Sequence, residues 1–152
     1  MRSERLCLMM FFLAVKANYG KRRKIFLINL TKNIILTDVC ALTCNAKCKN
    51  FFTPEIDGLK QSWDGKVCFC NPPYGREIGK WIEKAATSFA TTVMLLPART
   101  DTRWFHEWVL PQAEIHFLKG RLKFGGAKNG APFPSMIVIF NNNKKGVKNE
   151  NR

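Results

Sequence analysis

Short apolar runs alternate with amphipathic segments along residues 35–140 of this 152-residue chain. The apolar runs are of strand length, and we expect strands at 34–39, 66–70, 91–97, 114–118 and 135–140. Apolar residues recur at helical spacing in two segments, 76–90 and 101–111. Strands that alternate with helices predict one α/β domain with a mainly parallel sheet that helices cover on both faces.

The two expected helices each have one apolar face. In the first we expect Ile78, Trp81, Ile82, Ala85 and Phe89 to pack on the sheet. The second begins at a cap, Thr100 or Asp101, and its buried side contains Trp104, Phe105 and Trp108. Trp63, which lies before the second strand, is also expected in the core.

Polar or turn-forming residues stand where three of the expected strands end. Asp38, Asn71 and Pro97 occupy these positions. Because parallel α/β sheets bind their ligands at the carboxyl ends of the strands, we expect the three residues to lie along one rim that carries the function.

Positive charge is concentrated at the two ends of the chain. The formal net charge is +14, and residues 35–140 contribute only +4 of it, with 13 Lys and Arg against nine Asp and Glu. Nucleic acid suits such a charge, and solvated basic ends explain it equally well. We therefore divide the chain into a basic and apolar leader (1–34), a domain (35–140) and a basic disordered tail (141–152).

Six cysteines raise the question of disulfides or a metal. Cys40, Cys44 and Cys48 recur every four residues without a CxxC pair, and we expect Cys68 and Cys70 to project to opposite faces of their strand. We therefore expect free thiols in a reducing cytoplasm and no metal site, with structural zinc as the alternative.

The N-terminal segment has the basic start and short apolar run of a signal peptide. Its apolar part, Leu6 to Val15, is too short to span a bilayer, and the basic KRRK at 21–24 follows soon after it. We expect a cytoplasmic monomer with no membrane attachment. A secreted, disulfide-bonded protein is the alternative.

The residues Asn71, Pro72, Pro73 and Tyr74 form an NPPY sequence between a strand and a helix. The amino group of a nucleobase is a weak nucleophile because its lone pair is delocalised, so acceptors have to hold it. The Asn71 side-chain carbonyl and the Pro72 backbone carbonyl can accept its two N–H groups, and the prolines stiffen the turn. Tyr74 offers a flat face to an extruded base, and Gly75 keeps the pocket unobstructed. A structural turn in which Asn71 caps the helix is the alternative.

With these residues the chain resembles the phage-type DNA N6-adenine methyltransferases, which are Dam-like and use S-adenosylmethionine. The resemblance covers about Leu36 to Phe140 and rests on TDVCA, NAKCKNFFTPEIDGL, CNPPYGREIGKWIEKA, LLPARTDTRWFH, GRLKFGGAKNGAPFPSM and IVIF. It implies a Rossmann-like S-adenosylmethionine-dependent methyltransferase fold, with Asn71 to Tyr74 as the catalytic motif. The implied reaction moves a methyl group to N6 of an adenine flipped out of double-stranded DNA.

The resemblance also assigns residues to the cofactor. Asp38 looks like the acidic part of the S-adenosylmethionine site, and Asp57 looks like a second contact near the adenine moiety. Carboxylates at strand ends can accept hydrogen bonds from the cofactor's ammonium or hydroxyl groups. For either aspartate, a turn residue is the alternative.

Basic residues near the expected rim are candidates for DNA binding. Arg99 follows the strand that ends at Pro97, and three others lie in the glycine-rich loop: Arg121, Lys123 and Lys128. Such a loop can lie along a duplex, with its cations on phosphates and Phe124 or Phe133 packing nearby. Solvated charge is the alternative.

Two features depart from the family pattern. Residues 1–34 show no resemblance, so the N-terminal part is atypical or truncated, and no glycine-rich loop follows Asp38. A catalytically inactive DNA-binding remnant with an incomplete cofactor pocket is therefore an alternative to the enzyme. A methyltransferase that acts on RNA or on protein glutamine is another, because NPPY also occurs in such enzymes.

Overall fold

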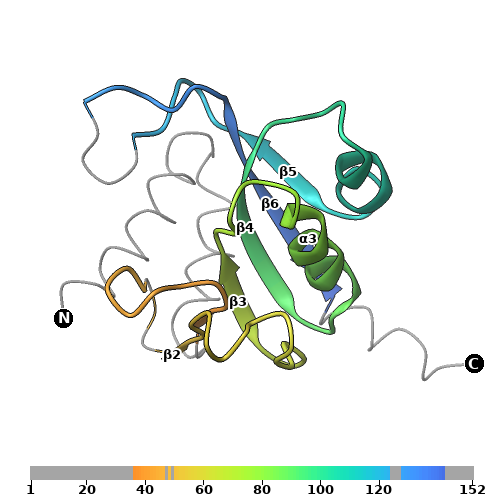
Figure 1. Cartoon of the computed structure of the whole chain (residues 1–152). Helices are drawn as coiled ribbons and strands as arrows, with labels where there is room; N and C mark the ends of the chain where they lie inside the picture. The colour runs from red at the N-terminus through yellow and green to blue at the C-terminus, as the bar shows by residue number, and fades with distance from the viewer. Residues whose placement is uncertain (1–35, 47, 49, 124–127, 143–152) are drawn as a thin grey trace, which may run out of the picture.

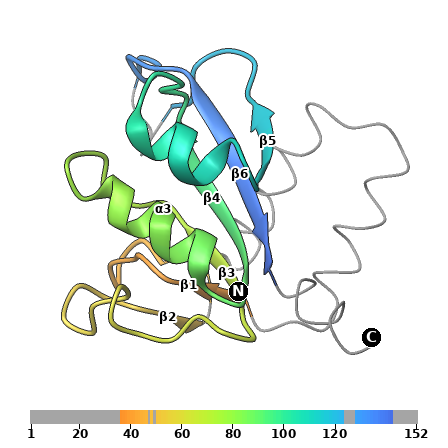
Figure 2. The same cartoon turned by 90° about the vertical axis from the view of Figure 1, so that its right-hand side faces the viewer.

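The computed structural model describes residues 36–46, 48, 50–123 and 128–142. In this part of the chain six strands form one sheet, in the order β2-β1-β3-β4-β6-β5 (Figure 1 and Figure 2). Their bounds are β1 Leu36–Asp38, β2 Asn50–Phe51, β3 Val67–Cys70, β4 Thr91–Pro97, β5 Glu114–Phe117 and β6 Ser135–Asn141. The first four strands run parallel, whereas β6 is antiparallel to both of its neighbours, β4 and β5. The expected α/β architecture with a mainly parallel sheet is confirmed.

Strand β4 forms the centre of the sheet. All seven of its residues are buried, as its unbroken apolar run predicts for a strand covered on both faces. Met94 and Leu96 face the side where the helices pack, and Val93 and Leu95 face the other side. A strand buried in this way has little freedom to shift, so its carboxyl end is a rigid base for a site.

Helix α3 (Ile78–Thr87) connects β3 to β4 and packs against the sheet. Its buried residues include Ile78, Trp81 and Ile82, which confirms most of the expected apolar face. Phe89 is an exception, because its side chain is 62% exposed. The expected packing of Phe89 is wrong because the helix ends at Thr87 and the next residue is already extended.

The second expected helix is a π-helix, η1 (Phe105–Val109), instead of a regular α-helix. The Leu110 N–H donates to the Phe105 carbonyl at 2.8 Å, a hydrogen bond that spans five residues. Phe105 and Val109 are buried, and Trp104 and Trp108 pack partly buried against the same core. The expected apolar face is therefore present on a wider helical turn.

Helix α3 and η1 lie on the same side of the sheet (Figure 2). On the opposite side, Val93, Leu95 and Ile137 are 5 to 7% exposed, with Leu118 and Leu122 packed against them. The described residues contain no helix on that side, so helices on both faces of the sheet stay a prediction. None of the helices among the described residues is long and apolar enough to cross a membrane.

Cys68 and Cys70 are both fully buried in the core on the α3 side of the sheet. The expectation that they face opposite sides is wrong, since residues two apart in a strand share a face. The five cysteines that the structure describes form no disulfide with one another. Cys7 and the whole of the expected leader, residues 1–34, lie outside the described residues.

The folded domain continues two residues past the expected boundary at 140. Strand β6 ends at Asn141, and Asn142 is 6% exposed. The Asn142 side-chain amide donates to the carbonyls of Ala85, Ala86 and Ser88 at 3.2, 3.0 and 3.1 Å. It therefore satisfies carbonyl groups at the end of α3 that the helix leaves without partners.

Candidate active site

The sheet has a topological switch point between β1 and β3, where strands are added on opposite sides of β1. From β1 the chain adds β2 on one side, and then crosses to add β3 on the other. In an open α/β sheet such a switch point opens a crevice at the carboxyl ends of the strands. Asp38 pairs with Phe69, and Cys70 with Met94, so β1, β3 and β4 end at the same edge. The expected position of Asp38, Asn71 and Pro97 at one edge of the sheet is confirmed, and the function of that edge stays a prediction.

The NPPY turn begins where β3 stops. Asn71 and Pro73 are exposed, and Pro72 between them is buried. The Tyr74 hydroxyl donates to Asn71 Oδ1 at 3.1 Å, and it also lies 3.3 Å from the Leu95 carbonyl oxygen. The Asn71 side chain is therefore held at the surface of the rim and has not turned into the core.

Tyr74 is partly buried, and its hydroxyl contacts both the exposed Asn71 and the buried strand β4. Burial raises the pKa of its phenol to about 12, with a smaller contribution from the nearby Cys70 thiol, so the hydroxyl keeps its proton at neutral pH. The Phe133 ring meets the Tyr74 ring edge-on, with centroids 5.4 Å apart and planes at 76°. Phe133 thereby becomes part of the rim. Its position among prolines in a basic loop gave no signal of this contact.

Asp38 closes β1 on the other side of the switch point. It is 2% exposed, and its Oδ1 accepts a hydrogen bond from the Cys40 N–H at 3.3 Å. Burial, assisted by the Asp38 charge, raises the pKa of the Cys40 thiol to about 11. Burial also raises the pKa of Cys70 far above its usual range. The thiols around Asp38 are therefore neutral, and its carboxylate can attract a cationic ligand group without competition from thiolates.

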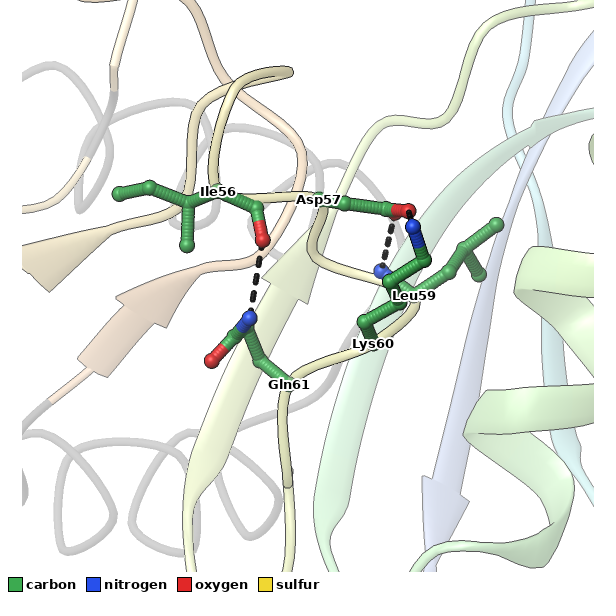
Figure 3. A network of polar contacts seen from close by, with 5 residues as sticks. All are labelled: Ile56, Asp57, Leu59, Lys60 and Gln61. Atoms are coloured by element: carbon green, nitrogen blue, oxygen red, sulfur yellow. Dashed lines mark hydrogen bonds and ion pairs between the residues drawn. The ribbon is translucent and has the colours of Figure 1, made fainter.

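Asp57 and Gly58 bring a loop against the end of β1. A Cβ atom on Gly58 would lie 2.0 Å from the Val39 carbonyl oxygen, so only glycine allows this approach. Asp57 has a φ of 55°, and its Oδ1 accepts the Leu59 N–H at 3.2 Å. Its Oδ2 lies 3.3 Å from Lys60 Nζ (Figure 3). Asp57 thus shapes a turn, as the alternative interpretation requires, and its contact with a cofactor stays a prediction.

In the connection between β5 and β6, the described residues 118–123 and 128–134 form an arm at the same edge of the sheet. The Leu118 N–H donates to the Ser135 carbonyl at 3.0 Å and the Ala131 N–H to the Leu122 carbonyl at 2.7 Å, so the two sides of the arm run together. Pro134 accepts a hydrogen bond from the Ala98 N–H, which ties the base of the arm to the end of β4.

All four basic residues expected to bind DNA are exposed. Arg121 and Lys123 lie on one side of the arm, Lys128 on the other, and Arg99 follows β4. Gly130 allows the two sides to approach, since a Cβ there would lie 2.7 Å from Arg121 Cβ. The ion pairs among the described residues involve none of these four cations. Their DNA contacts remain a prediction, and Phe124 lies outside the described residues.

The described residues form an α/β protein whose mixed, mostly parallel sheet carries an Asn-Pro-Pro-Tyr turn and a buried aspartate at its switch point, which is consistent with the methyltransferase class. Residues 23–151 match the family described as DNA N-6-adenine-methyltransferase (Dam). The chain belongs to this family. The match begins earlier than Leu36 and ends later than Phe140, so it includes residues 23–34, which we expected to lie outside it.

Two relatives carry the name DNA N-6-adenine-methyltransferase. The chain is 34% identical to that of Haemophilus phage HP1 (strain HP1c1) over 112 residues, which is 68% of this chain and 65% of the relative. It is 32% identical to that of Escherichia phage T1 over 133 residues, which is 72% of this chain and 56% of the relative. The chain thus spans less than two-thirds of the length of either relative.

Proposed function

We propose that this protein transfers a methyl group from S-adenosylmethionine to N6 of an adenine that is flipped out of double-stranded DNA. Family membership supports the reaction class. The observation that carries the proposal is the exposed Asn71 amide at the end of β3, with Tyr74 bonded to it and the buried Asp38 across the switch point. We also propose that the chain has a Rossmann-like methyltransferase fold and that the protein acts as a cytoplasmic monomer.

In this proposal the NPPY turn holds the target amino group. Asn71 Oδ1 and the Pro72 carbonyl oxygen accept hydrogen bonds from the two N–H groups of the adenine. These hydrogen bonds favour the pyramidal geometry that the nitrogen adopts when it attacks the methyl carbon. Tyr74 lies against the extruded base, and its neutral phenol adds no charge to the pocket. Because the attacking nitrogen becomes more acidic as it bonds to the methyl group, its proton can leave afterwards to water. Positioning is the main contribution of these residues.

The residues on the other side of the switch point fit the cofactor. S-adenosylmethionine supplies a methyl group on a positively charged sulfur when it is bound. Asp38 can accept hydrogen bonds from its ammonium or hydroxyl groups, and the Cys40 and Cys70 thiols near it stay neutral. Gly58 brings the Asp57 loop against β1, where Asp57 would contact the adenine moiety.

The arm supplies the contacts to the duplex. Arg121, Lys123 and Lys128 are exposed on it, and Phe133 at its base touches Tyr74. With Arg99 they would neutralise phosphates on either side of the extruded base. Backbone contacts of this kind fix the position of a protein on the duplex, so the arm would place the target adenine over Asn71.

The decisive experiment incubates the protein with methyl-labelled S-adenosylmethionine and mixed-sequence duplex DNA, followed by nucleoside analysis. We expect the label in N6-methyl-2′-deoxyadenosine released from the DNA. Label in RNA or in glutamine side chains of added protein, with none in duplex DNA, would instead support the alternative NPPY enzymes.

One observation favours the inactive remnant as a second candidate. Residues 41–46 follow Asp38 without a glycine, and Asn45 Oδ1 closes a turn there by accepting the Leu42 N–H at 2.7 Å. Calorimetry with S-adenosylmethionine separates the two candidates. Heat of binding supports the enzyme, whereas DNA binding without any cofactor binding supports the remnant.

A further inference from the structure

The Tyr74 hydroxyl lies between two acceptors from different parts of the rim. Asn71 Oδ1 is 3.1 Å away and the Leu95 carbonyl oxygen is 3.3 Å away. A phenol has one proton to share between them, and its raised pKa keeps that proton in place. The hydroxyl therefore connects the exposed amide to a central strand.

We propose that the Tyr74 hydroxyl is a positioning group that fixes which end of the Asn71 amide faces the target amino group. The inference deepens the proposed function and rests on it. An asparagine side chain presents an oxygen at one end of its amide and an NH2 group at the other. If the amide turned over, its NH2 would meet the NH2 of the base, and two donors cannot bond to each other.

The hydroxyl selects one of these two orientations when its proton goes to Asn71, the nearer of its two acceptors. While it donates to Asn71, the atom beside it has to be Oδ1, because the amide nitrogen has no acceptor site. A carbonyl oxygen can accept two hydrogen bonds, so Oδ1 keeps one acceptor site for the base. Asn71 is exposed, and without the hydroxyl its amide would be free to rotate into water.

The hydroxyl can hold the amide because Tyr74 is itself well anchored. Leu95 lies one residue beyond the last pair between β3 and β4, Cys70 with Met94, so the hydroxyl meets its carbonyl just past the end of that ladder. Phe133 braces the ring from the side. Tyr74 thus has two separable parts, a ring for the base and a hydroxyl for Asn71.

The test compares Tyr74→Phe, which removes only the hydroxyl, with Phe133→Leu, which removes only the brace on the ring. For Tyr74→Phe we expect single-turnover methyl transfer to fall roughly 10- to 100-fold, because the acceptor is misplaced. Base extrusion should persist, seen as the fluorescence rise of 2-aminopurine at the target position. Phe133→Leu should show the reverse, with weaker extrusion and a smaller change in the transfer step once the base is bound.

A second readout does not depend on activity. The side-chain amide resonances of Asn71, assigned by their loss in Asn71→Ala, should shift or broaden in Tyr74→Phe and stay in place in Phe133→Leu. Unchanged resonances in Tyr74→Phe, or a transfer rate within twofold of the original, would overturn the positioning role. If the unmodified protein methylates no DNA, the proposed function fails, and the amide resonances still report whether the hydroxyl holds Asn71.

Discussion

The two sides of the switch point are built differently. On the β3 side, Asn71 is exposed and is held by a single hydroxyl. On the β1 side, Asp38 is buried, and Asp57 is engaged with its own loop through Leu59 and Lys60. In the proposed function, the exposed amide suits a base that enters from DNA and leaves in every cycle, whereas the buried or turn-bound carboxylates suit a ligand enclosed by the fold.

The two sides should therefore respond differently to mutation. A change on the β3 side should alter chemistry and leave the fold intact, because few core contacts depend on Asn71. A change on the β1 side should alter stability and ligand affinity together, because backbone segments meet there with no spare space. The following predictions test this division, from the largest expected effect to the smallest.

Asn71→Ala should reduce methyl transfer by roughly 100- to 1,000-fold, the usual loss when a preorganised polar contact to the reacting group is removed. Binding of S-adenosylmethionine, measured by calorimetry, should change by less than about threefold, since the amide lies across the switch point from Asp38. Normal turnover in this variant would show that Asn71 takes no part in methyl transfer.

Gly58→Ala should lower the free energy of unfolding by about 3 kcal/mol, because the added Cβ would overlap the Val39 carbonyl oxygen. Urea denaturation measures the loss. Gly75→Ala is the matched control, since a Cβ there has open space, and its effect should stay within about 0.5 kcal/mol. Equal stability of the two variants would show that the β1 side is not tightly packed.

Asp38→Asn should weaken S-adenosylmethionine binding roughly tenfold or more, because hydrogen bonds to a charged acceptor are stronger than those to a neutral amide.

Asp57→Asn separates the two interpretations of Asp57, a cofactor contact and a turn residue. Asparagine tolerates the left-handed backbone and can close the same turn, so a purely structural role predicts unchanged affinity. A drop in affinity, measured by calorimetry, would instead assign Asp57 to the cofactor.

Lys123→Ala should weaken duplex binding a few-fold and reduce the slope of log affinity against log salt by about 1, as the loss of one phosphate contact requires. Fluorescence anisotropy at several salt concentrations measures both. Lys80→Ala is the control, because that lysine on α3 is paired with Glu77, the residue just before the helix. If both variants gave the original slope, the arm would not touch the DNA backbone.

The parts of the fold that the sequence predicted are those with a clear local period. The buried run of β4 and the apolar face of α3 both follow from spacing alone. Phe89 was misplaced because spacing does not show where a helix stops, and the π-helical turn of η1 was missed because its residues also fit an α-helix. Among site residues, NPPY was readable as a contiguous motif. The contact of Phe133 with Tyr74 joins segments about 60 residues apart and was not.

The sequence by itself determined the class of sheet, the rim at its strand ends and the chemistry available at Asn71. These depend on residue type and on local period, which every short segment carries with it. Only the tertiary structure decided that the Tyr74 hydroxyl meets both Asn71 and Leu95, that Gly58 lies against Val39 and that Asn142 caps α3. Such contacts form between segments that are brought together by burial of the shared core, and no local pattern specifies their partners.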